Sequence, residues 1–195
     1  MPTTTVHAVV YRPAHQRQLV ATDPHGKVNC AAVGLAIALD RATLGGLKVT
    51  GRLVRALSNE PRPKSDSPGL NLAQLRTVAA ILRVPIFLVR GSSWGDVLAS
   101  LRAGRAVLLP GTYGALGEWS CQPSFRGGHM IVVNHVSGDG DLFIYDPLCS
   151  KAREVPAPII REYAQSGGER SGYSAGRFDF AVVRATPLVA TVVTS

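Results

Sequence analysis

Long apolar runs are absent from this sequence of 195 residues. A membrane-spanning helix needs about 20 consecutive apolar residues, and no segment approaches that length, so we expect no membrane span. Residues 1–11 also lack a basic segment followed by an apolar core and a small-residue cleavage site. We therefore expect synthesis in the cytoplasm without a Sec-type secretory signal.

Cysteine is scarce, with three residues and no Cys-x-x-Cys spacing. This odd, sparse set argues against a disulfide framework and against a zinc ribbon, and it predicts at least one free thiol. We expect structural roles for Cys121 and Cys149, although Cys121 could lie near a site. His129 and His135 would share one face of a regular strand, but further ligands at suitable spacing are missing. The sequence thus predicts no metal and no cofactor.

Charged residues are few, at 17%, whereas apolar residues make up 46%, which is typical of a packed protein. Lys and Arg together outnumber Asp and Glu by 21 to 13, giving a net charge of +8. This excess favours approach to an anionic partner such as nucleic acid or a bacterial wall polymer. The basic residues are scattered, without a run of five, so we do not expect specific nucleic-acid binding.

Three helices are predicted in the first half of the chain. The segment CAAVGLAIALD, beginning at Cys30, is apolar nearly all round and indicates a buried helix. Thr50 is placed to cap a second helix, and Asn71 with Gln74 forms the pattern of a capping box for a third. The apolar face expected for the second helix consists of Val49, Leu53, Val54 and Leu57.

The second half of the chain predicts mainly strands. Gly138 and Gly140 lie in a turn between two apolar segments, HMIVVNHV and LFIYDP, which indicates a β-hairpin. Helices followed by a largely antiparallel sheet predict an α+β fold. Further strands are expected at 6–11, 86–89, 106–109 and 178–183, further helices at 94–101 and 156–165, and loops at 15–26, 59–69 and 110–128.

Three residues have the properties of a nucleophile, a base and an orienting carboxylate. Cys30 begins a helix, where the first-turn amides and the helix dipole lower the pKa of a thiol. His129 follows Gly127 and Gly128, whose lack of side chains lets substrate or another backbone come close. Asp146 lies 17 residues after His129, at the same open end of the predicted hairpin. We expect the Cys30 and His129 side chains to lie within about 6 Å, a modest rearrangement from hydrogen-bonding distance.

A helix-starting Cys followed later by GGHMIVVNHVSGDGDLFIYDP resembles the papain-like cysteine peptidase superfamily, and most closely its bacteriocin-processing, double-glycine-leader peptidase group. The resemblance covers residues 28–165. It implies a papain-like fold in which the central Cys-bearing helix packs on a mostly antiparallel sheet. We accordingly expect one domain over 1–195, with an N-terminal strand and loop (1–27), a peptidase-like core (28–165), and a closing strand and tail (166–195).

By this resemblance Cys30 is the nucleophile, His129 the base and Asp146 the third member of the triad. The sequence departs from the family at two positions: Ala31 stands where Gly is usual, and Pro24 stands where the family has an oxyanion-donating Gln. The replacement donors are, in order of preference, Gln18, Gln16, Asn29 and His25. Trp119 is expected to be either the anchor of a lid or a substrate-facing wall, beside Gly127 and Gly128.

The expected activity is hydrolysis of a peptide or amide bond through an acyl-enzyme. Its substrate would be a Gly-rich or small-residue peptide, or a cell-wall peptide cleaved by a phage or bacterial lytic module. The alternative is a catalytically weak or inactive papain-like domain that binds within a larger assembly, such as a phage virion tail. A third alternative is an acyl transferase of transglutaminase type, which uses the same order of Cys, His and Asp.

Overall fold

The computed structural model describes residues 11–17, 28–58, 69–174 and 176–184. The strand expected at 6–11 and the loops expected at 15–26 and 59–69 therefore lie almost entirely outside the described residues. An antiparallel sheet of six strands forms the centre, in the order β1-β6-β2-β3-β4-β5. Its strands are β1 (Ile86–Ser92), β2 (Ala106–Thr112), β3 (Gly128–Val136), β4 (Leu142–Tyr145), β5 (Arg153–Val155) and β6 (Phe178–Val183).

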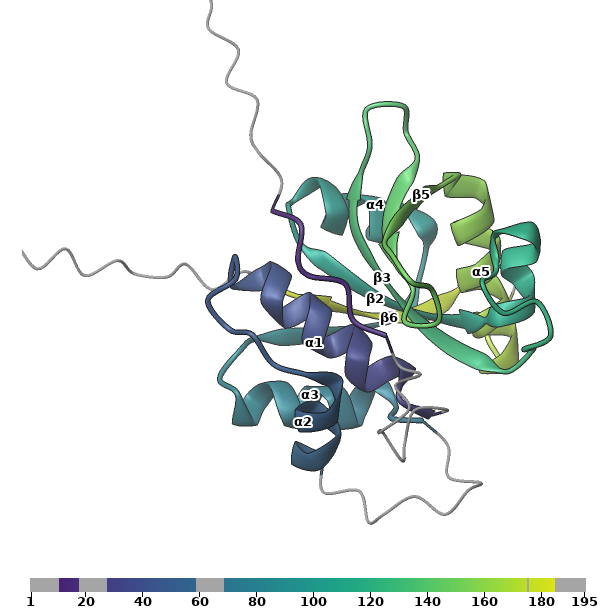
Figure 1. The fold of residues 1–195 in the computed structure, drawn as a ribbon. Coiled ribbons are helices and arrows are strands. Elements are labelled where there is room, and N and C mark those ends of the chain that lie inside the picture. The colour runs from purple at the N-terminus through teal and green to yellow at the C-terminus, as the bar shows by residue number, and fades with distance from the viewer. Residues whose placement is uncertain (1–10, 18–27, 59–68, 175, 185–195) are drawn as a thin grey trace, which may run out of the picture.

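Helices cover both faces of this sheet (Figure 1). On one face lie α1 (Cys30–Ala42), α2 (Gly51–Leu57) and α3 (Leu72–Ile81). On the other lie α4 (Trp94–Arg102), α5 (Ala157–Arg170) and the 3-10 helix η2 (Tyr113–Trp119). The α+β architecture expected from the sequence is confirmed.

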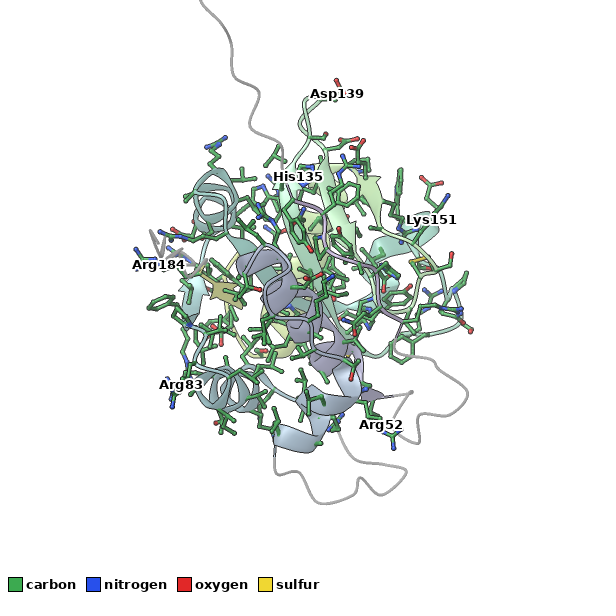
Figure 2. The ribbon with its side chains drawn as sticks, turned by 60° about the vertical axis from the view of Figure 1, so that its left-hand side comes forward. Arg52, Arg83, His135, Asp139, Lys151 and Arg184 are labelled. Atoms are coloured by element: carbon green, nitrogen blue, oxygen red, sulfur yellow. A yellow bond between two sulfur atoms is a disulfide. The ribbon has the colours of Figure 1, made fainter. Side chains whose placement is uncertain are left out.

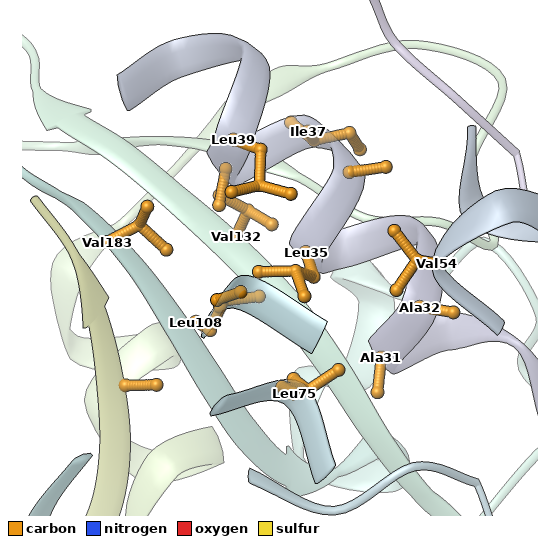
Figure 3. Close-up of a cluster of buried hydrophobic side chains, with 14 of the residues drawn as sticks. Ala31, Ala32, Leu35, Ile37, Leu39, Val54, Leu75, Leu108, Val132 and Val183 are labelled. Carbon is orange, nitrogen blue, oxygen red and sulfur yellow. The ribbon is translucent and has the colours of Figure 1, made fainter. Parts of the chain in front are cut away.

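Side chains alternate between two apolar cores along the central strands. Leu108 of β2 and Val132 of β3 pack against α1, as Figure 3 shows. Their neighbours Leu109 and Val133 point to the opposite face and pack with α4 and α5. Because both faces are covered, these strands are apolar at consecutive positions rather than at alternate ones. The nearly all-round apolar character of α1 has the same origin, since sheet and helices enclose it.

The predicted helix caps are confirmed. The Thr50 hydroxyl accepts a hydrogen bond from the backbone N–H of Leu53 at 3.2 Å. Asn71 and Gln74 form the reciprocal capping box, with hydrogen bonds of 2.7 and 3.0 Å. The predicted apolar face of α2 is wrong at Leu53, which is 44% exposed, because the helix packs through Val54 instead.

Other elements differ from the prediction in length or were not predicted. Helix α5 was expected to end at residue 165 but continues to Arg170, through Gly167 and Gly168. Both glycines pack against backbone: a Cβ on Gly167 would lie 2.7 Å from the Pro110 carbonyl oxygen, and one on Gly168 would overlap that of Arg177. The close approach to the sheet thus requires residues that are poor helix formers. Strand β5 and helix η2 were not predicted.

Residues 11–17 run across α1 and the end of the sheet (Figure 1). The Tyr11 hydroxyl donates to Asp40 Oδ1 at 3.1 Å, and the backbone N–H of Ala14 donates to Asp40 Oδ2 at 3.2 Å. Farther along, His15 Nε2 lies 2.9 Å from the carbonyl oxygen of Cys149. This segment therefore ties α1 to the chain that follows β4.

Most charged side chains lie at the surface, although Asp40, Arg55 and Asp146 are buried. Arg52, Arg83 and Lys151 lie at separate edges of the molecule in Figure 2, and Asp139 lies at the tip of the β3–β4 hairpin. Among the helices of the described residues, none is long and apolar enough to span a membrane.

Candidate active site

Cys30 is the first residue of α1 and is half-buried. The segment that leads into it is fixed by Arg55 of α2, a residue only 4% exposed. Arg55 donates through Nη2 to the Val28 carbonyl oxygen at 2.6 Å and through Nε to Asn29 Oδ1 at 3.3 Å. The helix start, and with it the thiol, is therefore held from α2.

His129 and Asp146 meet in the fully buried part of the site. His129 Nε2 lies 2.8 Å from Asp146 Oδ1, and both side chains have no exposed surface. Met130 and Tyr145 pack toward α1, so the alternation along β3 and β4 turns their neighbours His129 and Asp146 toward the other face. The hairpin thus brings these two residues together, as the spacing in the sequence predicts.

Asp146 has several partners besides His129. Its Oδ1 accepts the backbone N–H of Leu148 at 2.9 Å, and its Oδ2 accepts the Tyr113 hydroxyl at 3.0 Å. Arg153 Nη2 lies 3.7 Å from the same Oδ2. Burial opposes the charged form, but the hydrogen bond and charge of His129, with these donors, lower the pKa of Asp146 below its usual value. A permanent carboxylate consequently faces the imidazole.

The electrostatics of the site favour an ion pair between Cys30 and His129. Burial raises the pKa of Cys30, but interactions with His129 and with the backbone N–H groups of Met130 and Ala31 bring it below the ordinary thiol value. Burial likewise lowers the pKa of His129, but Asp146 and the Cys30 sulfur raise it to about 9. The arrangement thus supports a thiolate beside an imidazolium at neutral pH.

One nitrogen of the His129 ring faces the thiol by elimination. Nε2 is committed to Asp146, whereas the buried Nδ1 has no hydrogen-bond partner of standard geometry within the described residues. Since Cys30 and His129 shift each other's pKa, Nδ1 is the atom available to the thiol. The imidazole can thus take a proton from the sulfur on one side while the carboxylate orients it from the other.

Cys30 and His129 both line a cavity of about 670 Å³. Its walls come from the starts of α1 and α3, from β1, from the end of β2, from the starts of β3 and β6, and from the last turn of α5. This volume is in the range of ligand-binding clefts. The reactive atoms therefore border a space that could admit an extended peptide.

The residues predicted as oxyanion donors do not line the cavity where the structure describes them. Gln16 donates to the Val49 carbonyl oxygen at 2.9 Å and accepts the Gly51 N–H at 3.2 Å, so both ends of its amide are engaged away from the cavity. Asn29 is fully buried against Arg55 and does not line the cavity. Gln18 and His25 lie outside the described residues.

The two glycines before His129 admit side chains of the protein itself. A Cβ on Gly127 would lie 2.7 Å from Phe125, and one on Gly128 would lie 2.8 Å from the Arg170 guanidinium. Gly128 lines the cavity, whereas Gly127 does not. Trp119 also lies outside the cavity wall: it packs against the core on the α4 and α5 face, and its carbonyl oxygen accepts a hydrogen bond from Arg153.

The argument against a disulfide framework is wrong for Cys121 and Cys149, which are bonded to each other, whereas the expected free thiol is confirmed at Cys30. The bond joins the loop before β3 to the turn after Asp146, and the Cys149 sulfur lies 3.1 Å from Asp146 Oδ2. The two sulfurs and this carboxylate lie within 4.8 Å of one another. Since the sulfurs are bonded to each other, they offer no thiolate to a metal ion.

Two tyrosines near the site were not predicted from the sequence. The Tyr113 hydroxyl donates to Asp146 and accepts the Cys121 N–H at 2.8 Å, and its ring meets the His129 ring edge-on at 4.7 Å. The Tyr163 hydroxyl donates to the His129 carbonyl oxygen at 2.7 Å. Neither tyrosine stands in a local motif that signals this role, because the contacts span 33 and 34 residues of chain.

Two solved structures share this fold. A protein described as a C39-like peptidase from Bacillus anthracis matches with a TM-score of 0.61 and 16% identity, over 91% of this chain and 98% of its own. The peptidase domain of Streptococcus ComA, a bifunctional ABC transporter of a quorum-sensing pathway, matches with a TM-score of 0.54 and 13% identity, over 89% and 98%. No protein-family model and no curated protein matches the sequence. The fold is accordingly that of C39-like, papain-like peptidases, as the sequence resemblance implies.

Proposed function

We propose that this protein is a cysteine peptidase or amidase that works through an acyl-enzyme on Cys30. The observation that carries the proposal is the juxtaposition of a free, half-buried thiol and a buried imidazole–carboxylate pair at the wall of one cavity. The likeness in fold to C39-like peptidases supports the same reaction class. In this proposal Cys30 is the nucleophile, His129 the acid and base, and Asp146 the group that orients the imidazole.

The reaction begins with attack of the Cys30 thiolate on the carbonyl carbon of the scissile bond. The His129 imidazolium then donates its Nδ1 proton to the departing amine, which leaves a thioester on Cys30. Water attacks the thioester while Nδ1 of the now neutral ring takes up a proton, and the acid product leaves with regeneration of the thiolate. Asp146 accepts the hydrogen bond from Nε2–H throughout, so the other nitrogen remains directed at the sulfur.

Charge on the carbonyl oxygen requires hydrogen-bond donors. The backbone N–H of Cys30, at the start of α1, is one such donor, since the first-turn amides of a helix lack partners within the helix. We propose Gln18 as the second donor, because the amide of Gln16 is engaged by Val49 and Gly51. Replacing Gln18 with Ala is expected to lower kcat by about 10²–10³ if it fills this role.

Alkylation with iodoacetamide tests the nucleophile independently of turnover. Near pH 7 we expect one carbamidomethyl group, on Cys30, because Cys121 and Cys149 are disulfide-bonded. His129→Ala is expected to slow the reaction about 10- to 100-fold, since the Cys30 pKa then loses the lowering effect of the imidazole. If Cys30 reacts only after denaturation, it is a core residue and the proposal fails.

The pH profile follows from the directions of the two pKa shifts. The pKa of Cys30 is lowered, so the thiolate forms below the range of an ordinary thiol; the pKa of His129 is raised to about 9, so the acid is lost as pH rises through that value. We expect kcat/KM to be bell-shaped, with a plateau around neutral pH and a fall above about pH 9. A profile in which kcat/KM rises once, with its midpoint at the ordinary pKa of a thiol, would contradict the ion pair between Cys30 and His129.

Turnover is tested with mixed peptides and with bacterial wall stem peptides, comparing wild type with Cys30→Ser by mass spectrometry. We propose peptides of a bacterial wall as substrate, cleaved by a phage or bacterial lytic module, because a basic chain favours an anionic polymer. Cleavage of free peptides but not of wall peptides would contradict the proposed wall substrate and leave the peptidase activity supported. A reactive Cys30 without cleavage of either would favour a binding role in a larger assembly, and incorporation of an added amine would favour an acyl transferase.

A further inference from the structure

The walls of the candidate active-site cavity carry an excess of positive charge. Arg90 of β1 and Arg170, the last residue of α5, line it together with Cys30 and His129. Asp179 of β6 is the single carboxylate among the described residues that line it. Since the His129 pKa is raised to about 9, its imidazolium adds to this excess at neutral pH.

The carboxylate is already engaged, whereas the two guanidinium groups are not. Asp179 Oδ1 accepts the Gly91 N–H at 2.9 Å, and the Tyr173 hydroxyl also hydrogen-bonds to this carboxylate. Neither the Arg90 side chain nor the Arg170 side chain forms an ion pair or a hydrogen bond with another residue that the structure describes. Both side chains are exposed, so their donors are available to a ligand in the cavity.

Arg170 lies over the residue that precedes His129 and lines the same cavity as Cys30 and His129. Its Nη1 is 2.8 Å, and its Cζ 3.4 Å, from the position that a Cβ on Gly128 would take, and Gly128 directly precedes His129. The glycine is what gives the guanidinium room to lie there, because any larger residue would displace it. A substrate bound with its scissile carbonyl at Cys30 would therefore have residues close to this cation.

We propose that the cavity selects substrates with a carboxylate near the scissile bond, and that Arg170, assisted by Arg90, binds this carboxylate. The proposal rests on the peptidase function proposed above and names the class of its substrate. A guanidinium presents donors in a planar fork that matches a carboxylate. The carboxylate could be an acidic side chain or the C-terminal carboxylate of a peptide, and the peptide experiment below separates these two sources.

A pair of small reagents tests the charge preference without requiring turnover. Iodoacetate and iodoacetamide both alkylate a thiolate with loss of iodide, but only iodoacetate carries a carboxylate. We expect Arg170→Glu to lower the ratio of the iodoacetate rate to the iodoacetamide rate at Cys30 by about two- to fivefold, given the usual strength of an exposed ion pair. Arg170→Lys should retain most of the ratio, and high salt should reduce it in wild type.

The matched control is Arg161→Glu, an exposed arginine on the same helix that does not line the cavity. It changes the net charge by the same amount, so a general charge effect would move both variants alike. Gly128→Ala provides a second test, because it displaces the guanidinium without altering the charge and should lower the ratio less than Arg170→Glu. Equal ratios in wild type and Arg170→Glu, or equal falls in Arg170→Glu and Arg161→Glu, would overturn the proposal.

Peptides then identify the source of the carboxylate. Matched peptides carrying Glu or Gln at each position around the cleaved bond, each with a free or an amidated C-terminus, are compared by kcat/KM. A preference for Glu over Gln that Arg170→Glu abolishes supports side-chain recognition, and dependence on the free C-terminus supports the other source. If Cys30 does not react with iodoacetamide in the native protein, the peptidase function fails; if it reacts but shows no charge preference, only the present inference fails.

Discussion

The two halves of the site are held in different ways. The side chains of Asp146 and His129 have no exposed surface and have partners from η2, α5 and the turn after β4, beside a disulfide. Cys30 lies at the wall of a cavity, and its position depends on a helix start fixed by Arg55. The proposed base is thus fully buried where it borders the cavity, whereas the proposed nucleophile is half-buried at the start of a helix, where a substrate can reach it.

This difference predicts which variants affect activity alone and which affect activity and stability together. A change on the Cys30 side alters chemistry while the fold stays intact, because few contacts depend on a half-buried thiol. A change on the Asp146 side alters chemistry and stability together, because a buried charge loses its partners. The following predictions test this division, from the largest expected effect to the smallest.

Cys30→Ser should abolish hydrolysis, with a loss of about 10⁴-fold or more in kcat, because removing a nucleophile that acts with its base removes the whole unit. Its free energy of unfolding should differ from that of wild type by no more than about 1.5 kcal/mol, as for a modest substitution. Urea denaturation and peptide hydrolysis measure the two quantities. A large loss of stability with retained activity would place Cys30 in the core rather than at the reaction.

Asp146→Ala should lower both activity and stability, with a loss of about 3–5 kcal/mol in the free energy of unfolding, because it leaves His129 buried and unpaired. Asp146→Asn keeps a hydrogen-bond acceptor for Nε2–H and should be milder in both respects. It should also lower the His129 pKa from about 9, which NMR titration of the imidazole measures. Equal losses for the two variants would show that the acceptor does not orient the ring.

Cys121→Ala with Cys149→Ala should destabilise the protein by about 3–4 kcal/mol, as expected for a bond that closes a loop of 28 residues. Hydrolysis should fall less than in Asp146→Ala, because Tyr113, Leu148 and Arg153 still hold the carboxylate. Thermal unfolding with and without reductant gives an independent measure. An unchanged melting temperature would remove the disulfide from the structural support of the site.

Tyr113→Phe should have the smallest effect of these variants on the site. It should lower the free energy of unfolding by about 1–3 kcal/mol, because it removes one hydroxyl that donates to Asp146 and accepts from the Cys121 N–H. The ring remains in contact with His129, so the loss reports the hydrogen bonds alone. We expect a lowered kcat with a nearly unchanged KM. Tyr163→Phe, which frees the His129 carbonyl oxygen instead, is the matched comparison, and an equal loss of kcat there would contradict a specific role for the Tyr113–Asp146 hydrogen bond.

Short-range signals in the sequence determined much of the fold. The start of α1 at Cys30, the caps at Thr50 and Asn71, and the β3–β4 hairpin all depend on residues close together in the chain, and each was predicted. The hairpin also accounts for the approach of His129 to Asp146, because a turn of known position fixes which strand ends meet. These elements could be predicted from the sequence because interactions between residues close together in the chain determine them.

Tertiary structure alone decided the surroundings of the site. The disulfide between Cys121 and Cys149, the contacts of Tyr113 and Tyr163, and the position of Arg170 over Gly128 join residues 28 to 42 positions apart. Nothing in the local sequence specifies such pairs, because they arise when η2 and α5 pack on the second face of the sheet. The juxtaposition of His129 and Asp146 could thus be predicted from the sequence, but the groups that surround the proposed triad and charge its cavity required the packed structure.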